Sequence, residues 1–219
     1  MTPFELLKTA CHAACRQTPA CAPSYRAMLK TENISQMMAV WREYWEDISG
    51  GKYADIINDR LPAAYPTLRK EMNAAGIYVN ECPKMAPEYV RVLVTDCDYL
   101  VEIHDYAKCY ILGNAVVRAW DHSQVYSDRC DEATIELYDH AYGHVGKGWV
   151  QARNSSQLWT AADAVLNGSV TCEAHGGIVK AYSYRKLEAY GDTKVYATTE
   201  RNITLYGNAK FCSVMTKTL

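Results

Sequence analysis

The sequence contains no proline after Pro87, although seven prolines lie at or before that position. Because proline cannot donate to a strand ladder, its absence from the rest of the chain favours continuous strand pairing there. The chain also lacks an apolar run of about 18 residues, so we expect no membrane-spanning helix. The first residues, Met1 to Glu5, lack the charged lead and apolar core of a signal peptide, which indicates a cytoplasmic location.

The sequence has little net charge and no regular cysteine spacing. A formal charge of −2 argues against a general nucleic-acid binder, which would need an excess of Lys and Arg to offset phosphates. The nine cysteines form an odd, irregular set that does not resemble a secreted disulfide framework. We therefore expect free thiols in a reducing compartment.

The sequence pattern of residues 1–88 predicts a small helical domain. Thr2, Pro3 and Glu5 supply a capping box for a helix that runs to about Arg16. Further helices are predicted over 23–29, from a cap at Ser35 through 37–48 to the Gly50-Gly51 pair, over 53–60, and over 66–75 with Gly76 as its end. The remainder, residues 77–87, is predicted to link the two halves.

Trp41 and Trp45 are spaced four residues apart in this helical region. Such a pair can stack on a ligand, or it can form the core stripe of an amphipathic helix. We favour the core stripe, because helix packing requires apolar pairs at this spacing.

An apolar residue recurs at every eighth position from about Tyr89 onward. The spacing is interrupted near residues 126–134 and 143–149, where insertions would bulge a corner. The repeating positions are Leu93, Val101, Cys109, Val117, Val125, Ile135, Val150, Leu158, Leu166, Val179, Leu187, Val195, Ile203 and Phe211. A fixed period of this kind is typical of repeat architectures.

The repeating unit is apolar–x–Ala–Tyr–Asp/Gly–x–Ala/Ser–x. It is clearest in the units that begin at Val117, Ile135, Leu187 and Ile203. Positions 1, 3 and 7 are apolar or small and should face inward, while position 5 suits a corner. One octad cannot bury its own apolar face, so stacked octads are required. The sequence therefore predicts an α+β protein: a helical domain, 1–88, followed by a β-solenoid (β-helix) of eight-residue repeats, 89–219. Whether a coil holds two octads or three stays open.

This pattern resembles the octad-repeat proteins of phages and bacterial mobile elements. The resemblance covers residues 90–215 and includes the strings Ser123-Gln124-Val125 and Ser156-Gln157-Leu158. Those proteins often place a short helical region ahead of the repeats. The resemblance implies the architecture; most members of the group have no characterised function.

The outward positions are where a function of the repeats would have to be located. Position 4 is often aromatic, and position 8 of the later octads is often lysine. The candidate binding surface is Trp120, Tyr138, Tyr182, Tyr190, Tyr206, Lys186, Lys194 and Lys210. The aromatic row is either a structural ladder or a contact surface. The lysines either bind an acidic partner or keep the exposed strands from pairing with other chains, and we favour the second interpretation.

Two clusters of residues are candidate metal sites. Stacked corners would bring His122 and His140 together with carboxylates, and Cys11, Cys15, Cys21 and Cys82 could meet in the helical domain. Turn geometry explains the corner aspartates without a metal, and the cysteine spacing is not a standard zinc motif. We therefore expect no metal and no cofactor. No phosphate-binding glycine loop, nucleophile elbow or zinc-protease helix is present.

These observations favour a non-catalytic protein that acts through protein–protein contacts. The resemblance sharpens this to a phage-type inhibitor of a bacterial defence complex such as a CRISPR nuclease, located in the host cytoplasm. Two alternatives stay open: a carbohydrate- or nucleic-acid-binding module that uses the Tyr and Lys rows, and a metal-dependent enzyme at the corner histidines. Because a solenoid has open ends, we also expect a homodimer through the C-terminal end, 211–219.

Overall fold

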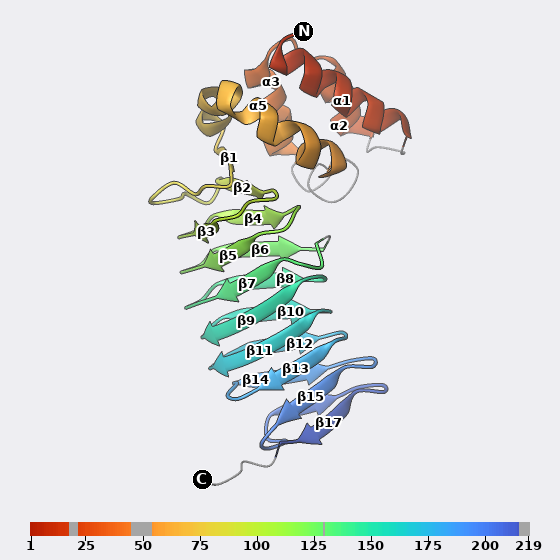
Figure 1. Ribbon diagram of the computed structural model, residues 1–219, viewed down its shortest axis with the longest axis vertical. Coiled ribbons are helices and arrows are strands. Elements are labelled where there is room, and N and C mark those ends of the chain that lie inside the picture. The colour runs from red at the N-terminus through yellow and green to blue at the C-terminus, as the bar shows by residue number, and fades with distance from the viewer. Residues whose placement is uncertain (18–21, 45–53, 129, 215–219) are drawn as a thin grey trace.

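The computed structural model describes residues 1–17, 22–44, 54–128 and 130–214. Helices occupy one end of the molecule and a column of stacked β-coils forms the rest (Figure 1). The architecture is the predicted α+β combination of an N-terminal helical region and a β-solenoid. No helix of the described residues is both long and apolar enough to cross a membrane.

The helical region contains four helices within the described residues. They are α1 (Pro3–Gln17), α2 (Ala22–Leu29), α3 (Ile34–Glu43) and α5 (Ala54–Ala74). The predicted capping box begins α1: the Glu5 N–H donates to Thr2 Oγ1 at 3.2 Å, and the Thr2 nitrogen donates to Glu5 Oε2 at 2.6 Å. The Met1–Glu5 segment is thus a helix start, as its sequence predicts.

Two helix predictions were wrong in detail. Asn33, rather than Ser35, caps α3, because its side chain accepts from the Gln36 N–H at 3.0 Å. The two helices predicted over 53–60 and 66–75 form the single helix α5, which continues through its prolines and ends before Gly76 at φ +80°. Trp41 is fully buried, as the core-stripe interpretation requires, whereas Trp45 and Gly50-Gly51 lie outside the described residues.

The solenoid consists of two parallel sheets that share its long axis. Sheet A has the strand order β1-β2-β4-β6-β8-β10-β12-β14-β16, and sheet B has the order β3-β5-β7-β9-β11-β13-β15-β17. The chain alternates between the sheets from β2 onward, so that one coil holds two octads, one in each sheet. Val101 accordingly pairs with Val117, sixteen residues further along the chain.

The strands of sheet A are β1 (Ile77–Val79), β2 (Arg91–Val94), β4 (Lys108–Ile111), β6 (Gln124–Ser127), β8 (Tyr142–Val145), β10 (Gln157–Thr160), β12 (Thr171–Ala174), β14 (Lys186–Ala189) and β16 (Ile203–Leu205). Those of sheet B are β3 (Leu100–Ile103), β5 (Val116–Ala119), β7 (Thr134–Leu137), β9 (Trp149–Asn154), β11 (Asp163–Gly168), β13 (Ile178–Ala181), β15 (Lys194–Ala197) and β17 (Lys210–Ser213). The first strand, β1, lies within the segment predicted as a linker.

The inward octad positions form one continuous apolar core between the sheets. Val117 and Ala119 show the pattern in β5: both are fully buried, while Arg118 between them points outward. The small residues at position 7 are buried as predicted, and Ser123 and Thr193 use their hydroxyls to donate to the carbonyls of Trp120 and Tyr190. The inward code is therefore confirmed through β15; in the last coil Ile203, Ala209 and Phe211 are only partly buried and Leu205 is 38% exposed.

The phase of the repeat differs from the prediction at two positions. In β2 the inward residue is Val92, which pairs with Cys109, whereas Leu93 points outward and is buried under the helices. In β11 Ala164 occupies position 1, and Leu166 lies at position 3 beside Ala152. Each correct residue has further apolar residues just after it, Leu93 after Val92 and Val165 and Leu166 after Ala164, so the phase of these two units was ambiguous in the sequence.

The predicted interruption at 143–149 is not an insertion. It contains most of β8, which pairs in register with both β6 and β10. Gly143 occupies the inward position where an apolar residue was expected. A Cβ there would lie 2.6 Å from Leu137 Cδ1, so the glycine makes room for the large leucine.

The corner positions adopt the left-handed backbone that position 5 predicts. Asp121 and Asp139 have φ of 59° and 52°, and Gly191 and Gly207 have φ of 61° and 66°. Asp and Gly are among the residues that tolerate this conformation best. The octad consensus thus encodes the corner as well as the core.

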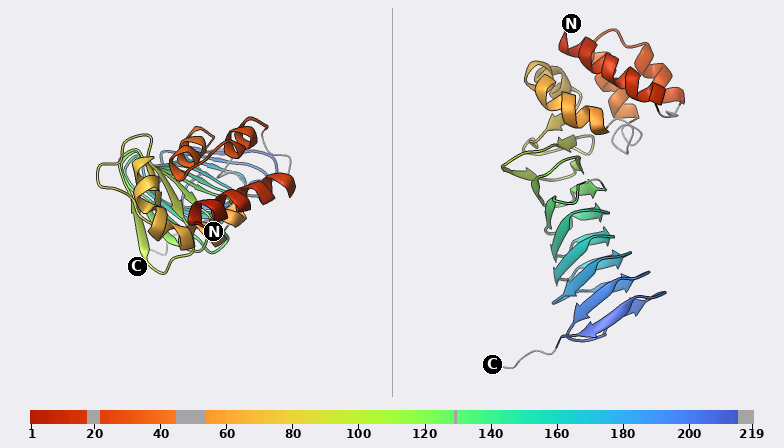
Figure 2. Two further views of the ribbon diagram at one scale, coloured as in Figure 1. Left: turned by 90° about the horizontal axis from the view of Figure 1, so that it is seen from above. Right: turned by 45° about the vertical axis from the view of Figure 1, so that its right-hand side comes forward.

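The helical region covers the first coils on the sheet A side (Figure 2). Met37, Trp41 and Met72 share one buried cluster with Leu93 of β2 and Tyr110 of β4. In the described residues this cluster contains no strand residue of sheet B. The helices therefore cap the first coil and leave the outer face of sheet B open.

Candidate functional site

The outer face of sheet A carries a column of seven stacked rings. Their centroids are 4.9, 6.2, 4.1, 5.1, 4.7 and 4.5 Å apart in order along the column. We call this set the sheet A column; it consists of Tyr110, Tyr126, His144, Trp159, His175, Tyr190 and Tyr206. Consecutive coils contribute consecutive rings, because strand pairing sets neighbouring strands about 4.8 Å apart.

The rings of the column do not all come from the same position of the octad. Up to Trp159 the rings come from outward strand positions, whereas His175, Tyr190 and Tyr206 follow the ends of β12, β14 and β16. Glu173 takes the strand position beside Trp159, and its Oε1 lies 2.6 Å from His175 Nε2. This contact orients the His175 ring, so that the stack continues across the change of position.

Stacking leaves the ring edges, rather than the ring faces, available to a partner. Each inner ring of the column has a neighbour on both faces, with interplanar angles of 4° to 29°. Sugars and nucleic-acid bases bind aromatic side chains by lying on a free ring face. The exposed edges present hydroxyl, imidazole and indole groups instead, and these suit hydrogen bonding to a protein surface.

One end of the column lies beneath the helical region. Tyr110 is buried in the cluster that includes Trp41 and Met72, and Tyr126 packs against its edge. From there the rings become accessible toward Tyr206, which is 43% exposed. The helices and the solenoid are therefore joined through the same row of aromatic side chains.

Sheet B carries a shorter stack with an ionic network. Trp120 and Tyr138 stack at 4.1 Å, and the Arg153 guanidinium lies 5.6 Å from the Tyr138 centroid. Arg118 donates to Glu136 at 2.6 Å, and Tyr138 Oη donates to the same carboxylate at 2.9 Å. Burial alone would raise the pKa of Glu136, but the hydrogen bonds from Arg118 and Tyr138 outweigh it and lower that pKa.

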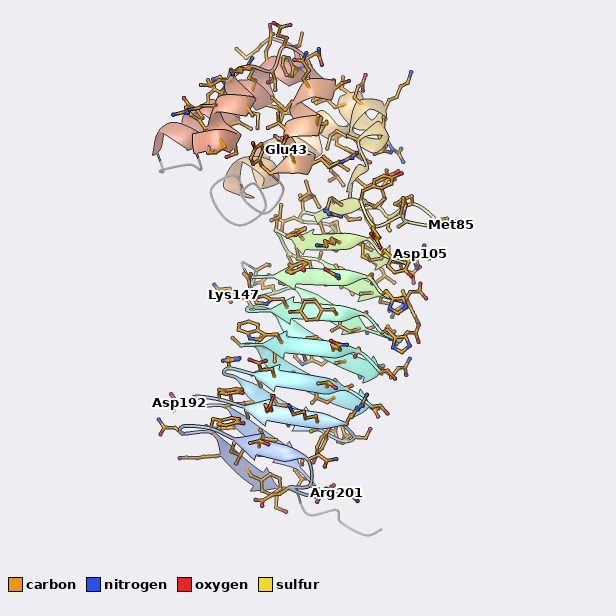
Figure 3. All side chains as sticks on the ribbon, turned by 180° about the vertical axis from the view of Figure 1, so that it is seen from behind. Glu43, Met85, Asp105, Lys147, Asp192 and Arg201 are labelled. Carbon is orange, nitrogen blue, oxygen red and sulfur yellow. The ribbon has the colours of Figure 1, made fainter. Side chains whose placement is uncertain are left out.

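The corner histidines form a third stack, on the turns that lead from sheet B to sheet A. Tyr106, His122 and His140 lie in a row with centroids 5.5 and 5.3 Å apart. Asp105 and Asp121 lie at the adjacent corners (Figure 3 labels Asp105), and Asp121 Oδ2 accepts from the Asp105 N–H at 3.2 Å. These carboxylates tie one coil to the next.

No three His, Cys, Asp or Glu side chains of the described residues are arranged to hold a metal ion. His122 and His140 do come together, as the enzyme alternative required, but Asp121 accepts from the backbone N–H of Asp105 and Asp139 accepts from the side-chain amide of Asn154. No disulfide joins the cysteines of the described part of the chain. Of the N-terminal set weighed for zinc, the Cys15 side chain and Cys21 lie outside the described residues.

The structure divides the predicted aromatic residues between the two sheets. Tyr190 and Tyr206 stack at 4.5 Å on sheet A, and Trp120 and Tyr138 stack on sheet B. Tyr182 follows β13 of sheet B and is 70% exposed, with no ring stacked on it among the described residues. It borders a cavity of about 290 Å³ together with Lys180, Tyr196 and Val214. Adjacent octads alternate between the sheets, so Tyr182 and Tyr190 cannot share a face.

The predicted lysine row is divided in the same way. Lys194 and Lys210 are register partners on sheet B. Lys186 begins β14 of sheet A, and its Nζ lies 3.0 Å from Glu188 Oε2. The basic row is therefore confined to the far end of sheet B.

Sequence reasoning missed most of the sheet A column, because it searched for aromatic residues at position 4 alone. Tyr110, Tyr126 and Trp159 each follow an inward residue directly, at position 2 of the octad. Reading the repeat in pairs of octads would have placed them in one row. His144 was missed because Gly143, the residue before it, stands where an apolar residue was expected, so that no octad was recognised there.

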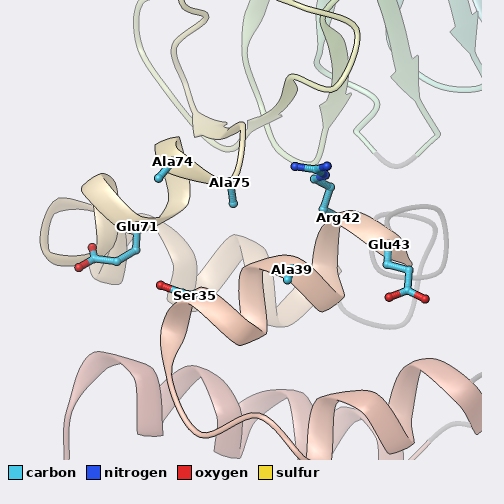
Figure 4. A pocket seen from close by; sticks show the side chains of 7 residues that line it. All are labelled: Ser35, Ala39, Arg42, Glu43, Glu71, Ala74 and Ala75. Atoms are coloured by element: carbon cyan, nitrogen blue, oxygen red, sulfur yellow. The ribbon is translucent and has the colours of Figure 1, made fainter.

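A further hollow lies between the helices α3 and α5 (Figure 4). It has a volume of about 580 Å³ and is lined by Ser35, Ala39, Arg42, Glu43, Glu71, Ala74 and Ala75. The Arg42 guanidinium lies 5.6 Å from the centroid of the Tyr89 ring. The charges around this hollow are of both signs, so its lining does not select one class of ligand.

The three stacks are rigid rows of side chains on an apolar core, and the ionic groups around them are paired locally. No protein-family model, no curated protein and no solved structure matches the chain.

Proposed function

We propose that the protein is a non-catalytic binding scaffold that contacts another protein along the sheet A column. The observation that carries the proposal is the face-to-face stacking of the rings in this column, which presents the edges of the rings beyond Tyr126 to solvent. A partner protein can pack on such edges and hydrogen-bond to them. Tyr and Trp are the residues most enriched among those that dominate the binding energy of interfaces.

The rigidity of the column supports this proposal. A side chain that is ordered before binding loses less conformational entropy when the complex forms, which saves about 0.5–1.5 kcal/mol for each flexible side chain. His144 and Trp159 lie 4.1 Å apart with nearly parallel rings, and each is fixed by a ring on its other face. The column therefore offers a preorganised surface.

The partner we propose is a bacterial defence complex, such as a CRISPR nuclease, in the host cytoplasm. This identification rests on the resemblance of residues 90–215 to proteins of phages and mobile elements. A rigid protein without a catalytic cluster can inhibit such a complex by occupying the surface that the complex needs for its own substrate. Inhibition by occupancy requires contact area and shape rather than turnover.

Tyr182 favours a second candidate function, a carbohydrate- or nucleic-acid-binding module. Its ring is 70% exposed, lies beside Lys180, and has no stacked neighbour within the described residues. A sugar or a base could therefore stack on it. Only this ring of the predicted binding surface is free of a stacked neighbour, so the module would be small and the protein-binding proposal is better supported.

Site-specific photo-crosslinking in the native host tests the proposal. A photo-reactive phenylalanine at Gln157, exposed beside Trp159, should capture one partner protein that mass spectrometry identifies. The same residue at Thr198, exposed at the end of sheet B, is the matched control. A partner captured equally from both positions, or from neither, would contradict the proposal. A nuclease-sensitive adduct at either position would favour the second candidate.

Interference by a CRISPR nuclease tests the proposed partner class separately. Cells that express the protein, an active nuclease and a matching guide should show restored plaque formation by the targeted phage. The Q157R/T171R variant, which adds bulk and charge beside the column, should lose this effect, and the T198R control should keep it. Full interference in the presence of the protein, across the nuclease types of the host, would reject the inhibitor assignment and leave the crosslinking result standing.

A further inference from the structure

At the far end of sheet B, three neighbouring strands place Tyr182, Thr198 and Val214 in one row. These residues directly follow β13, β15 and β17, and the register of the three strands sets them beside one another (Figure 1). Trp120 and Tyr138 occupy the same position after β5 and β7, where their rings stack at 4.1 Å. The position is therefore one at which rings stack, and at Thr198 the ring is missing.

The missing ring leaves a gap beside Tyr182. Tyr182 and Val214 are two strands apart, which separates their backbones by about 10 Å, and the short side chain of Thr198 lies between them. The cavity of about 290 Å³ that Tyr182 borders is also lined by Thr198 and Val214, with Tyr196 beside them. Ligand pockets begin at about 300 Å³, so this cavity suits one ring system of a ligand rather than a whole large molecule.

A ring inserted into this gap would continue the stacking that the rest of the solenoid shows. The rings of the sheet A column come from consecutive coils and lie 4.1–6.2 Å apart. The gap at Thr198 has the width of one such step, because it corresponds to one strand of the sheet. Tyr182 is 70% exposed and has no stacked neighbour within the described residues, so its ring is available to the inserted one.

The gap is bordered by a cation and by no carboxylate. Lys180 is part of the lining, two residues before Tyr182 on the same strand. Lys194 and Lys210 are register partners further along the same face. Among the described residues, none of these three lysines has an ion-pair partner. Residues 178–214 contain six Lys or Arg and three Asp or Glu, so this end of the solenoid is basic although the whole chain is not.

From the gap and the unpaired lysines we infer that the far end of sheet B binds a nucleotide. The base inserts between Tyr182 and Val214 and stacks on the Tyr182 ring. The phosphate lies near Lys180, whose Cα is about 7 Å from that of Tyr182 along the strand. A nucleotide suits the site better than a neutral sugar or an aromatic side chain, because it also supplies negative charge to the lysines. Every base has a ring face, so stacking alone selects no particular base.

The nucleotide is either free or part of a single strand. A strand that leaves the gap along the sheet passes Lys194 and Lys210, whose Cα atoms are about 4.8 Å apart. The inference rests on the second candidate function proposed above, to which it gives a site and a ligand class. It does not rest on the sheet A column, which lies on the other sheet. The chain would then carry a protein-binding surface and a nucleotide site on different sheets.

Fluorescence anisotropy of the full chain with a labelled single-stranded hexanucleotide at low salt tests the site. Thr198→Trp supplies the missing ring from the protein itself and should weaken binding at least about tenfold, because the inserted indole occupies the place of the base. Thr198→Ser keeps the gap and should bind as the wild type does. Tyr182→Ser removes the stacking face and should weaken binding about five- to 100-fold. Both positions are exposed, so these variants should fold, and urea denaturation checks that they do.

The salt dependence of binding tests the phosphate contact separately. Lys180→Gln should reduce the slope of log K against log salt concentration by about 0.7, the value for one phosphate contact of a single strand. The matched control is Lys186→Gln, which changes an exposed lysine of sheet A that lies beside Glu188 and should leave the slope unaltered. Adenosine monophosphate that competes as well as the unlabelled hexanucleotide would assign the site to a free nucleotide. Much weaker competition would assign it to a strand.

Three outcomes would overturn the inference. The first is a wild-type protein that binds neither the hexanucleotide nor adenosine monophosphate at low salt. The second is binding that Thr198→Trp and Tyr182→Ser both leave unchanged, because the nucleotide would then lie elsewhere. The third is displacement of the hexanucleotide by a neutral oligosaccharide but not by adenosine monophosphate, which would assign the gap to a sugar. Crosslinking at Gln157 tests the sheet A proposal, and its outcome is independent of all of these results.

Discussion

The two sheets of the solenoid are built from the same inward residues but differ on their outer faces. Sheet A begins beneath the helices and carries seven rings stacked along its length. Sheet B is open, and its stack is short, with Trp120 and Tyr138 stacked on each other and the Arg153 guanidinium beside Tyr138. The comparison teaches that the core constrains only every second side chain of a strand, so that the outward set is free to diverge.

The largest expected effect separates inward from outward residues within one strand. Leu187 of β14 is fully buried between Cys172 and Ile203, so Leu187→Ala should lower the free energy of unfolding by about 2–5 kcal/mol. Glu188→Ala, at the next residue and pointing outward, should change it little. Urea denaturation followed by circular dichroism measures both. Equal losses would mean that the octad core does not govern stability.

A matched pair of tryptophans compares the two outer faces directly. Trp159 stacks on both sides in the sheet A column, and each aromatic contact contributes about 0.5–1.5 kcal/mol beyond area burial. We expect Trp159→Ala to cost about 2–3 kcal/mol of unfolding free energy. Trp149→Ala removes an exposed ring on sheet B and should cost less than about 1 kcal/mol in dilute, monomeric protein. If the two losses are the same, stacking does not stabilise sheet A.

The smallest expected effect is the pH dependence of the ionic network on sheet B. The folded pKa of Glu136 is lowered, so its contribution to stability is present above the unfolded pKa and is lost as the pH falls through the folded value. The contribution should be less than about 1 kcal/mol, because the pair is near the surface. Glu136→Gln should therefore flatten the decline of stability between pH 7 and about pH 3.

The matched control for this titration is Glu102→Gln. Glu102 is in the same outward column and has no ion pair within the described residues. If the free energy of unfolding declines as steeply with falling pH in Glu136→Gln as in the wild type, the network with Arg118 and Tyr138 adds no acid-sensitive stability.

The sequence alone was sufficient to predict the helical region, the solenoid, and the inward and corner positions of the octad. These features depend on local rules: alternation along a strand, small residues beside a turn, and Asp or Gly where φ is positive. The capping box at Thr2 and Glu5 and the end of α5 at Gly76 are local in the same sense. Where two neighbouring residues were both apolar, as at Val92 and Leu93, the same rules could not choose the phase.

Only the tertiary structure decided which outward side chains meet. The number of octads in a coil determines whether Tyr182 and Tyr190 share a face, and that number depends on how two sheets close around one core. The sheet A column joins residues about sixteen positions apart, and strand pairing, rather than sequence proximity, brings them into contact. The inward code repeats because every coil buries the same core; the outward rows exist only once the coils are stacked.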